Sequence, residues 1–190
     1  MKITQTLLVE RTDTPVGLML VVTDAEGALR AVDWHDYEDL MHTLLRRQYR
    51  HSAFTTEPHP SRSSAARALA AYFDGDVKAI DGLSVAMGGT DLQRRVWSAL
   101  RDIPAGETIS YGVLAARIGQ PTAVRAVGHA NGANLIDLVV PCHRVVGANR
   151  SLTGYGGGLE RKRWLLDHER KWLTGSARAE PVARSVRSPR

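Results

Sequence analysis

The chain has 190 residues, of which 43% are hydrophobic and 24% charged, and its formal net charge is +5. These values are typical of a globular protein with one large or two small domains, and no apolar run approaches the length that would span a bilayer. The single cysteine excludes an internal disulfide and a cysteine-rich zinc site, so no metal is expected. Because the start MKITQTLLVE lacks the pattern of a signal peptide, we expect a cytoplasmic location.

The charge is divided unevenly along the chain. Residues 1–86 carry 9 Lys/Arg and 12 Asp/Glu, a net of −3, whereas residues 87–190 carry 16 Lys/Arg and 8 Asp/Glu, a net of +8. An acidic half joined to a basic half favours a second half that binds a polyanion. A solvated basic face with a basic tail would give the same counts, so charge alone leaves both interpretations open.

The first half predicts an antiparallel meander followed by two helices. Strand-like residues fill three segments separated by turn residues: 2–10, 18–23 and 28–34. Apolar residues recur at helical spacing in 39–49 and 65–73. The polar segment 51–64 contains two prolines and predicts a loop. Nothing in this half forms a chemical motif, and its histidines do not share metal-ligand spacing.

The second half begins after a boundary near residues 86–89 and is predicted to be mainly helical. Thr90–Gln93 has the form of a capping box that opens a helix. Ser110 can cap a short helix over 111–118, which Gly119 ends, and Pro121 suits the first position of another helix that runs through Ala130. Two short helices joined by a tight turn predict a helix–turn–helix.

The second helix of this pair has unusually small side chains. Ala123, Ala126, Gly128 and Ala130 would let its backbone approach another surface closely, either a phosphate backbone or a neighbouring helix. Arg125 is the one long charged residue in its middle and could reach outward, although an ordinary exposed arginine would look the same.

The only cysteine follows a predicted buried strand at 138–140 and precedes a glycine-rich loop at 147–158 and a last helix at 159–172. Taken alone, Cys142 would be assigned to core packing, because free cysteine is among the most buried residue types. Its neighbours favour chemistry: Pro141 fixes the chain direction, and the imidazole of His143 could take the thiol proton, directly or through a water. Glu169 on the last helix could in turn orient His143.

These motifs resemble the alkylguanine-DNA alkyltransferase family. The resemblance is carried by PCHRV at 141–145, by Asn134 eight residues before the cysteine, by TGYGGG at 153–158, and by three flanking segments that occur in the same order: ISYG at 109–112, AVRAVG at 123–128 and RWLLDHE at 163–169. It is strong over residues 87–170 and weaker over the first strands, where the turn Thr14–Gly17 matches.

The resemblance implies an α+β fold: a small antiparallel N-terminal sheet with helices in a supporting domain (1–86), then a mainly α, DNA-binding domain (87–172) whose winged helix–turn–helix carries the active-site cysteine. Residues 173–190 are not part of the family pattern; because they are rich in Ser, Pro and Arg and lack periodicity, we expect a disordered basic tail there. The implied activity is DNA repair by direct reversal, in which the alkyl group of O6-alkylguanine, and conceivably of O4-alkylthymine, passes once and irreversibly to Cys142. No cofactor is implied, and the partner is alkylated double-stranded DNA, bound through its minor groove by a monomer whose binding could be cooperative.

The resemblance also implies a role for each matching residue. His143, a water and Glu169 would activate Cys142, and Asn134 would brace the turn that holds it. Tyr111 would donate a proton to guanine N3 and press on the target phosphate. Arg125 would fill the gap left by the extruded nucleotide. The small residues that would face the DNA are Ala123, Ala126 and Gly128. The residues that would form the pocket for the base are Val145, Tyr155, Gly156 and Gly157.

Some residues depart from the family pattern. Leu135 stands where many members have proline, and Asp137 places a charge in a usually apolar stretch near the cysteine turn. The alternatives are a non-catalytic binder of alkylated DNA, a helix–turn–helix regulator and a cysteine hydrolase. The presence of Cys142 argues against the first, the few base-reading side chains of the slim helix against the second, and the lack of an identifiable oxyanion hole against the third.

Overall fold

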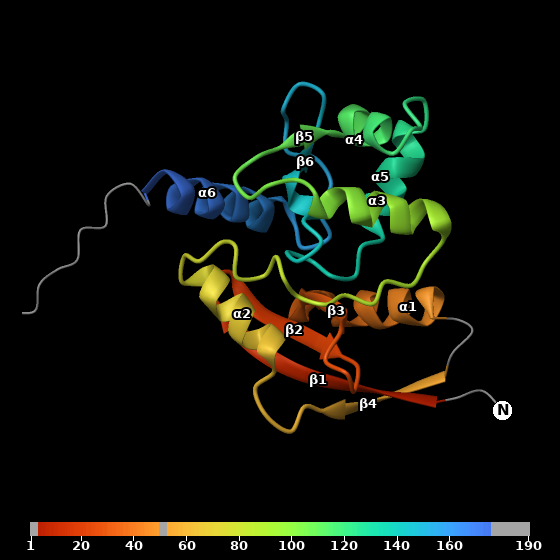
Figure 1. Cartoon of the computed structure of the whole chain (residues 1–190), viewed down its shortest axis with the longest axis vertical. Coiled ribbons are helices and arrows are strands. Elements are labelled where there is room, and N and C mark those ends of the chain that lie inside the picture. Colours follow the sequence, from red (N-terminus) through yellow and green to blue (C-terminus); the bar gives the residue numbers. More distant parts are fainter. Residues whose placement is uncertain (1–3, 50–52, 176–190) are drawn as a thin grey trace, which may run out of the picture.

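The computed structural model describes residues 4–49 and 53–175. A sheet occupies the lower half of the view in Figure 1, and the helices of the second half of the chain lie above it. The predicted α+β fold class is confirmed. Among the described residues, no helix is both long enough and apolar enough to cross a membrane.

The sheet contains the predicted meander and one strand more. Strands β1 (Thr4–Thr14), β2 (Gly17–Thr23) and β3 (Leu29–Trp34) are paired antiparallel, and the turn between β1 and β2 ends at Gly17, whose φ of 126° favours glycine. The fourth strand, β4 (Ala53–Pro58), pairs in parallel with β1 at the edge of the sheet.

The prediction of a loop over 51–64 is therefore wrong for Ala53–Pro58. Four of the six side chains of β4 are exposed, so the segment shows none of the alternation of apolar and polar residues on which the prediction depended. An edge strand of this kind is held by backbone hydrogen bonds to its one neighbour rather than by buried side chains.

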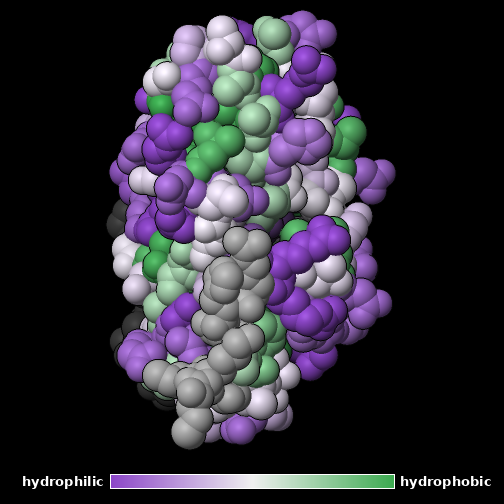
Figure 2. Space-filling view, turned by 90° about the vertical axis from the view of Figure 1, so that its right-hand side faces the viewer, coloured by the Kyte–Doolittle hydropathy of each residue, from purple (hydrophilic) through white to green (hydrophobic). Residues whose placement is uncertain are grey.

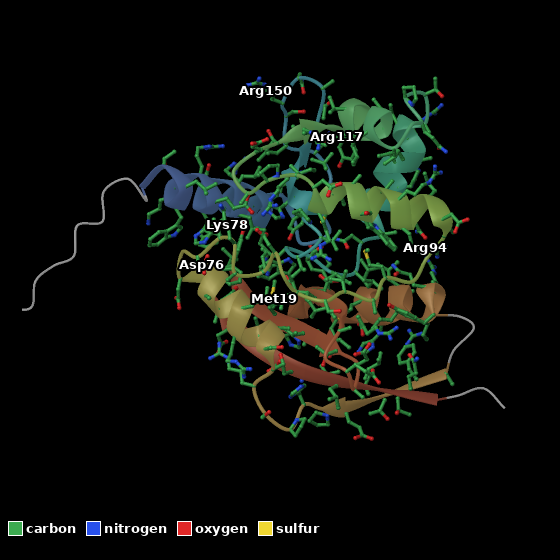
Figure 3. All side chains as sticks on the ribbon, in the orientation of Figure 1. Met19, Asp76, Lys78, Arg94, Arg117 and Arg150 are labelled. Atoms are coloured by element: carbon green, nitrogen blue, oxygen red, sulfur yellow. The ribbon has the colours of Figure 1, made fainter. Side chains whose placement is uncertain are left out.

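Two helices of the first half pack against the sheet. A single 3-10 turn (His35–Tyr37) leads into α1 (Glu38–Gln48), which buries Met41 and Leu45. Helix α2 (Ser64–Phe73) is capped by the Ser63 hydroxyl, which accepts a hydrogen bond from the Ala66 amide. The interior between these helices and the sheet includes Met19 of β2, which is fully buried and is labelled in Figure 3.

The second half contains α3 (Asp91–Arg101), α4 (Tyr111–Arg117), α5 (Val124–Gly132) and α6 (Leu159–Gly175). Two two-residue strands, β5 (Ile109–Ser110) and β6 (Val145–Val146), pair in parallel. The capping box of α3, the cap of α4 at Ser110 and the left-handed Gly119 are present as predicted.

Three predictions for this half of the chain differ from the structure. Pro121 does not open α5: the Ala123 amide donates to the Gln120 carbonyl, so Pro121 occupies the second position of a β-turn, where its fixed φ also fits. Residues 138–140 form a turn rather than a strand, because a short apolar run fits either structure when it is buried. Helix α6 continues through Gly175, and the rest of the predicted tail, residues 176–190, lies outside the described residues.

The two halves share one continuous buried core. The edge of β3 pairs with the segment that leads to the cysteine: the Val32 amide donates to the Leu135 carbonyl at 2.7 Å, and the Asp137 amide donates to the Val32 carbonyl at 2.8 Å. The sheet therefore positions the active-site turn directly. A domain boundary near residues 86–89 stays a prediction.

Replacement of Thr90 by alanine tests the capping box of α3. The Thr90 hydroxyl accepts from the Gln93 amide, and the Gln93 side chain accepts from the Thr90 amide. We expect T90A to lower the free energy of unfolding by about 1 kcal/mol, as measured by urea denaturation. Thr90→Ser keeps the hydroxyl and should stay close to the parent protein. Equal losses in both variants would contradict a capping role.

Candidate active site

Cys142 lies at the start of a one-turn 3-10 helix (Cys142–Arg144), directly after Pro141. Its side chain is only 3% exposed. The approach to it is a tight turn in which Leu138 has a φ of 70°, a conformation that costs a non-glycine residue on the order of 1 kcal/mol or more. The segment that pairs with β3 ends at this strained turn, and Cys142, which follows the turn, lies in the buried core.

Asn134 connects the two ends of this turn. Its side-chain amide donates to the Val140 carbonyl at 2.9 Å and contacts the Cys142 Sγ at 3.2 Å, while its oxygen accepts from the Ile136 amide at 3.0 Å. Because Asn134 is itself buried, these bonds are shielded from water and fix the position of the sulfur.

His143 and Glu169 form a buried pair. The His143 Nε2 lies 2.9 Å from the Glu169 Oε1, and both side chains are fully buried. The other ring nitrogen, Nδ1, has no hydrogen-bond partner among the described residues. Glu169 therefore holds one side of the imidazole and leaves the second nitrogen available for proton transfer.

Glu169 also receives hydrogen bonds from three other residues. Arg144 donates to it from Nε and Nη2, at 3.1 Å and 2.8 Å to Oε1. Tyr72 of α2 donates its hydroxyl at 3.0 Å, and the Gly106 amide donates at 2.9 Å to Oε2. A carboxylate with this many donors orders every segment that supplies one.

Burial and charge set the protonation of this pair. Burial opposes ionisation of Glu169, but electrostatic interactions and hydrogen bonds with His143 and Arg144 outweigh burial and hold the Glu169 pKa well below its ordinary value. Burial lowers the pKa of His143, so its imidazole is neutral at neutral pH and can accept a proton.

The thiol of Cys142 is held in its neutral form. Burial raises its pKa well above the ordinary value, and the nearby charge of Asp137 adds to the effect. The thiol contacts the Asp137 Oδ1 at 3.3 Å. Asp137, one of the two residues that depart from the family pattern, therefore contacts the sulfur directly.

Tyr111 is brought near the cysteine by the pairing of β5 with β6. Ser110 lies opposite Val146 in this pairing, so the first residue of α4 stands beside the strand that follows the cysteine turn. Tyr111 is half-buried between α5 and the glycine-rich loop: a Cβ added at Gly128 would meet its ring at 3.9 Å, and one added at Gly154 would meet its hydroxyl at 3.4 Å. Burial, followed by the charge of Cys142, raises the Tyr111 pKa.

Of the predicted pocket wall, Tyr155 lies beside His143. The Tyr155 ring lies 6.4 Å from the His143 ring in an edge-on arrangement, and Tyr155 accepts a hydrogen bond of 3.4 Å from the Trp34 indole. Gly157 lies so close to Trp34 that an added Cβ would be 2.2 Å from the indole nitrogen, whereas Gly156 is exposed. Val145 is fully buried.

The small-residue helix α5 presents a separate surface. Arg125 and Ala126 are exposed, Ala123 and Gly128 are half-buried, and Val127 anchors the helix in the core. Figure 2 shows the side of the molecule on which α4 and α5 lie: a strip of weakly hydrophobic surface in its upper half is bordered by hydrophilic residues. Arg117 of α4 and Arg94 of α3, labelled in Figure 3, are among the cations of this half.

Four residues of the site had no role in the sequence analysis. Arg144 belongs to PCHRV, and its place in that motif is the one signal that could have revealed it. Tyr72 and Trp34 come from the first half, and no sequence pattern around them indicates a place in the site. Lys162 sits in a charged run typical of an exposed helix, yet it is fully buried and donates to the carbonyls of Val145, Thr153 and Gly154; burial lowers its pKa to about 8.

Comparison with known proteins shows the family of this chain. Residues 91–171 match the family model described as 6-O-methylguanine DNA methyltransferase, DNA binding domain. A methylated-DNA–protein-cysteine methyltransferase of Salmonella typhimurium is 51% identical over 163 residues, which are 86% of this chain and 95% of that protein.

Two solved structures from Mycobacterium tuberculosis are similar to this chain. The structure of O6-methylguanine methyltransferase has a TM-score of 0.69 at 39% identity and covers 87% of this chain and 93% of its own. The structure of OGT in complex with DNA has a TM-score of 0.68 at 38% identity and covers 90% of this chain and 94% of its own. The resemblance indicated by the PCHRV motif is confirmed, and the chain belongs to the family of the 6-O-methylguanine DNA methyltransferases.

Proposed function

We propose that this chain repairs double-stranded DNA by transferring the alkyl group of O6-alkylguanine to Cys142, once per molecule. The observation that carries the proposal is the buried thiol itself, with a neutral imidazole on a buried carboxylate beside it and an exposed small-residue helix on the same half. O4-alkylthymine carries the same kind of bond between an oxygen of the base and the alkyl carbon, and we include it as a second substrate.

The transfer is a nucleophilic displacement. The sulfur attacks the alkyl carbon, the bond from that carbon to O6 breaks, and the thiol proton leaves as the new bond forms. His143, directly or through a water, takes this proton, and Glu169 stabilises the resulting imidazolium. The product is a thioether with no chemical route back to the thiol, so each molecule acts once.

Tyr111 is suited to assist the leaving group. Because burial raises its pKa, its hydroxyl stays protonated at neutral pH and can donate to guanine N3 as negative charge develops on the base. We also assign to Tyr111, the first residue of α4, contact with the target phosphate.

The base must enter the protein for this reaction, since the thiol is only 3% exposed. Extrusion of a nucleotide costs a few kcal/mol, which a side chain inserted into the gap partly offsets. We assign insertion through the minor groove to Arg125, with Ala123, Ala126 and Gly128 allowing close approach. Tyr155, Gly156, Gly157 and Val145 would receive the base. A cytoplasmic monomer suffices for this chemistry, and its DNA affinity should fall steeply with salt.

Intact-protein mass spectrometry tests the transfer. After incubation with a duplex that contains one O6-methylguanine, we expect one added methyl group per molecule, on the peptide that contains Cys142. Cys142→Ala should gain no methyl group and should still bind the duplex. An unmodified parent protein that binds the lesion would contradict the proposal and indicate a protein that only recognises damage.

Replacement of Glu169 by glutamine tests the carboxylate. We expect E169Q to lower the free energy of unfolding at pH 7 by about 3 kcal/mol, because buried Arg144 loses its charged partner, and to slow methyl transfer. Since the folded-state pKa of Glu169 lies below its ordinary 4.5, its stabilisation is present above pH 4.5 and is lost as the pH falls further. The difference between parent and variant should therefore shrink on acidification.

Urea denaturation at several pH values measures this difference, with exposed Glu107→Gln as the control. A difference between E169Q and the parent that does not change with pH would show that the Glu169 charge is not the source of the stability.

Replacement of Arg125 by alanine tests nucleotide extrusion. We expect R125A to slow methyl transfer from the duplex at least about tenfold, which corresponds to about 1.4 kcal/mol. Transfer from free O6-methylguanine base, which needs no extrusion, should be unchanged. Arg163→Ala removes the same charge from an exposed site on α6 and is the matched control. Equal slowing with both substrates would assign Arg125 to the fold or the pocket instead.

A further inference from the structure

Asp137 is a buried carboxylate for which the proposed mechanism has no use. We propose that Asp137 is a catalytic base: its carboxylate accepts the thiol hydrogen of Cys142 directly as the sulfur attacks the alkyl carbon. The inference rests on the proposed function and adds to it a second acceptor, beside His143, for the same proton.

The contacts around the sulfur support this assignment. The Cys142 Sγ donates to the Asp137 Oδ1 at 3.3 Å, and the Asn134 amide, at 3.4 Å, holds the same oxygen in place. The other carboxylate oxygen, Oδ2, is buried and has no hydrogen-bond partner among the described residues. No contact between Cys142 and His143 Nδ1 is present in the described part of the chain, where that nitrogen is also unpartnered. The acceptor in contact with the thiol is therefore Asp137.

The surroundings of Asp137 raise the pKa of its carboxyl toward the neutral range. It is faced by Asp33 of β3, by Tyr155 of the glycine-rich loop, by Arg161 of α6 and by the thiol itself, while Lys162 of α6 acts on the cysteine. Burial raises the pKa of Asp137 to about 6, and burial together with the charge of Asp137 raises that of Asp33 to about 8. The two carboxyls titrate as an interacting pair, and we assign the one negative charge that the pair carries at neutral pH to Asp137, whose Oδ1 accepts from the Cys142 thiol and the Asn134 amide.

This charge explains how a thiol with a raised pKa can react. A thiolate formed beside ionised Asp137 would place two negative charges together in the core, which the low dielectric disfavours. Transfer of the proton to Asp137 during the attack avoids that state. The S–H bond breaks and its proton binds Asp137, the sulfur electron pair forms the C–S bond, and the C–O6 pair leaves with guanine, which is reprotonated by Tyr111 or water.

The test compares the parent with Asp137→Asn and Asp137→Ser. Asparagine keeps the shape and the acceptor oxygen, and serine is a smaller second variant in case the amide disturbs the fold; thermal unfolding checks both. Two rates are measured from pH 5 to pH 9 by mass spectrometry: methyl transfer from the O6-methylguanine duplex, and methylation of Cys142 by iodomethane, which needs neither DNA nor base extrusion. Asp39→Asn removes an exposed carboxylate of α1 and is the control.

We expect both rates in the parent to rise as the pH passes about 6, where Asp137 ionises. In D137N and D137S both rates should fall about 100-fold at pH 7, and the rise should move toward alkaline pH, where the thiol ionises by itself. The residual reaction would proceed through His143.

Three results would overturn the inference. Faster reaction in the variants would show that Asp137 only suppresses the thiolate. Unchanged rates would show that it takes no proton, and a fall without a shift of the pH profile would show that it only positions the sulfur. The iodomethane arm separates this inference from the proposed function: a parent that takes no methyl from DNA refutes the proposed function, whereas the effect of D137N on iodomethane decides the role of Asp137.

Discussion

The structure depends on one buried carboxylate. Glu169 lies in the core with no exposed surface and is stabilised there by Tyr72 from α2, by the Gly106 amide, and by His143 and Arg144 from the cysteine turn. A buried charge is stable only while the groups that donate hydrogen bonds to it remain in place. The segments that supply these donors are therefore fixed relative to α6. The same interaction that orients His143 for chemistry thus joins the first half of the chain to the second.

The first half acts on the site at close range rather than as a remote support. β3 pairs with the segment that carries Asn134 and Asp137, and its last residue, Trp34, lies against Tyr155 and Gly157 of the pocket wall. The carboxyl of Asp33, next to Trp34, is sensitive to the charge of Asp137. A change in the sheet would therefore alter both the position of the sulfur and the charge beside it.

Local patterns in the sequence predicted the elements whose causes are local. The capping box at Thr90, the cap at Ser110 and the meander could be predicted because propensity and turn chemistry act within a few residues. β4 could not, since its pairing with β1 crosses about fifty residues and leaves no apolar alternation. The same limit applies to the site: His143 is adjacent to Cys142, and family resemblance supplied Glu169, but burial of Lys162 and the reach of Tyr72 depend on tertiary packing that periodicity does not encode.

If the chain acts as we propose, the burial of the thiol determines how it selects its substrate. Cys142 is enclosed by a strained turn, by Asn134 and by Asp137, and it is held neutral, so a passing electrophile meets neither an exposed sulfur nor a thiolate. In the proposed function, reaction would then require a group that is delivered to the sulfur, with its alkyl carbon against it and a proton acceptor already in contact. The low intrinsic reactivity of the thiol and the exposed, small-residue surface of α5 would be complementary: the first would prevent indiscriminate alkylation, and the second would provide the close approach to DNA that the proposed delivery of the base needs.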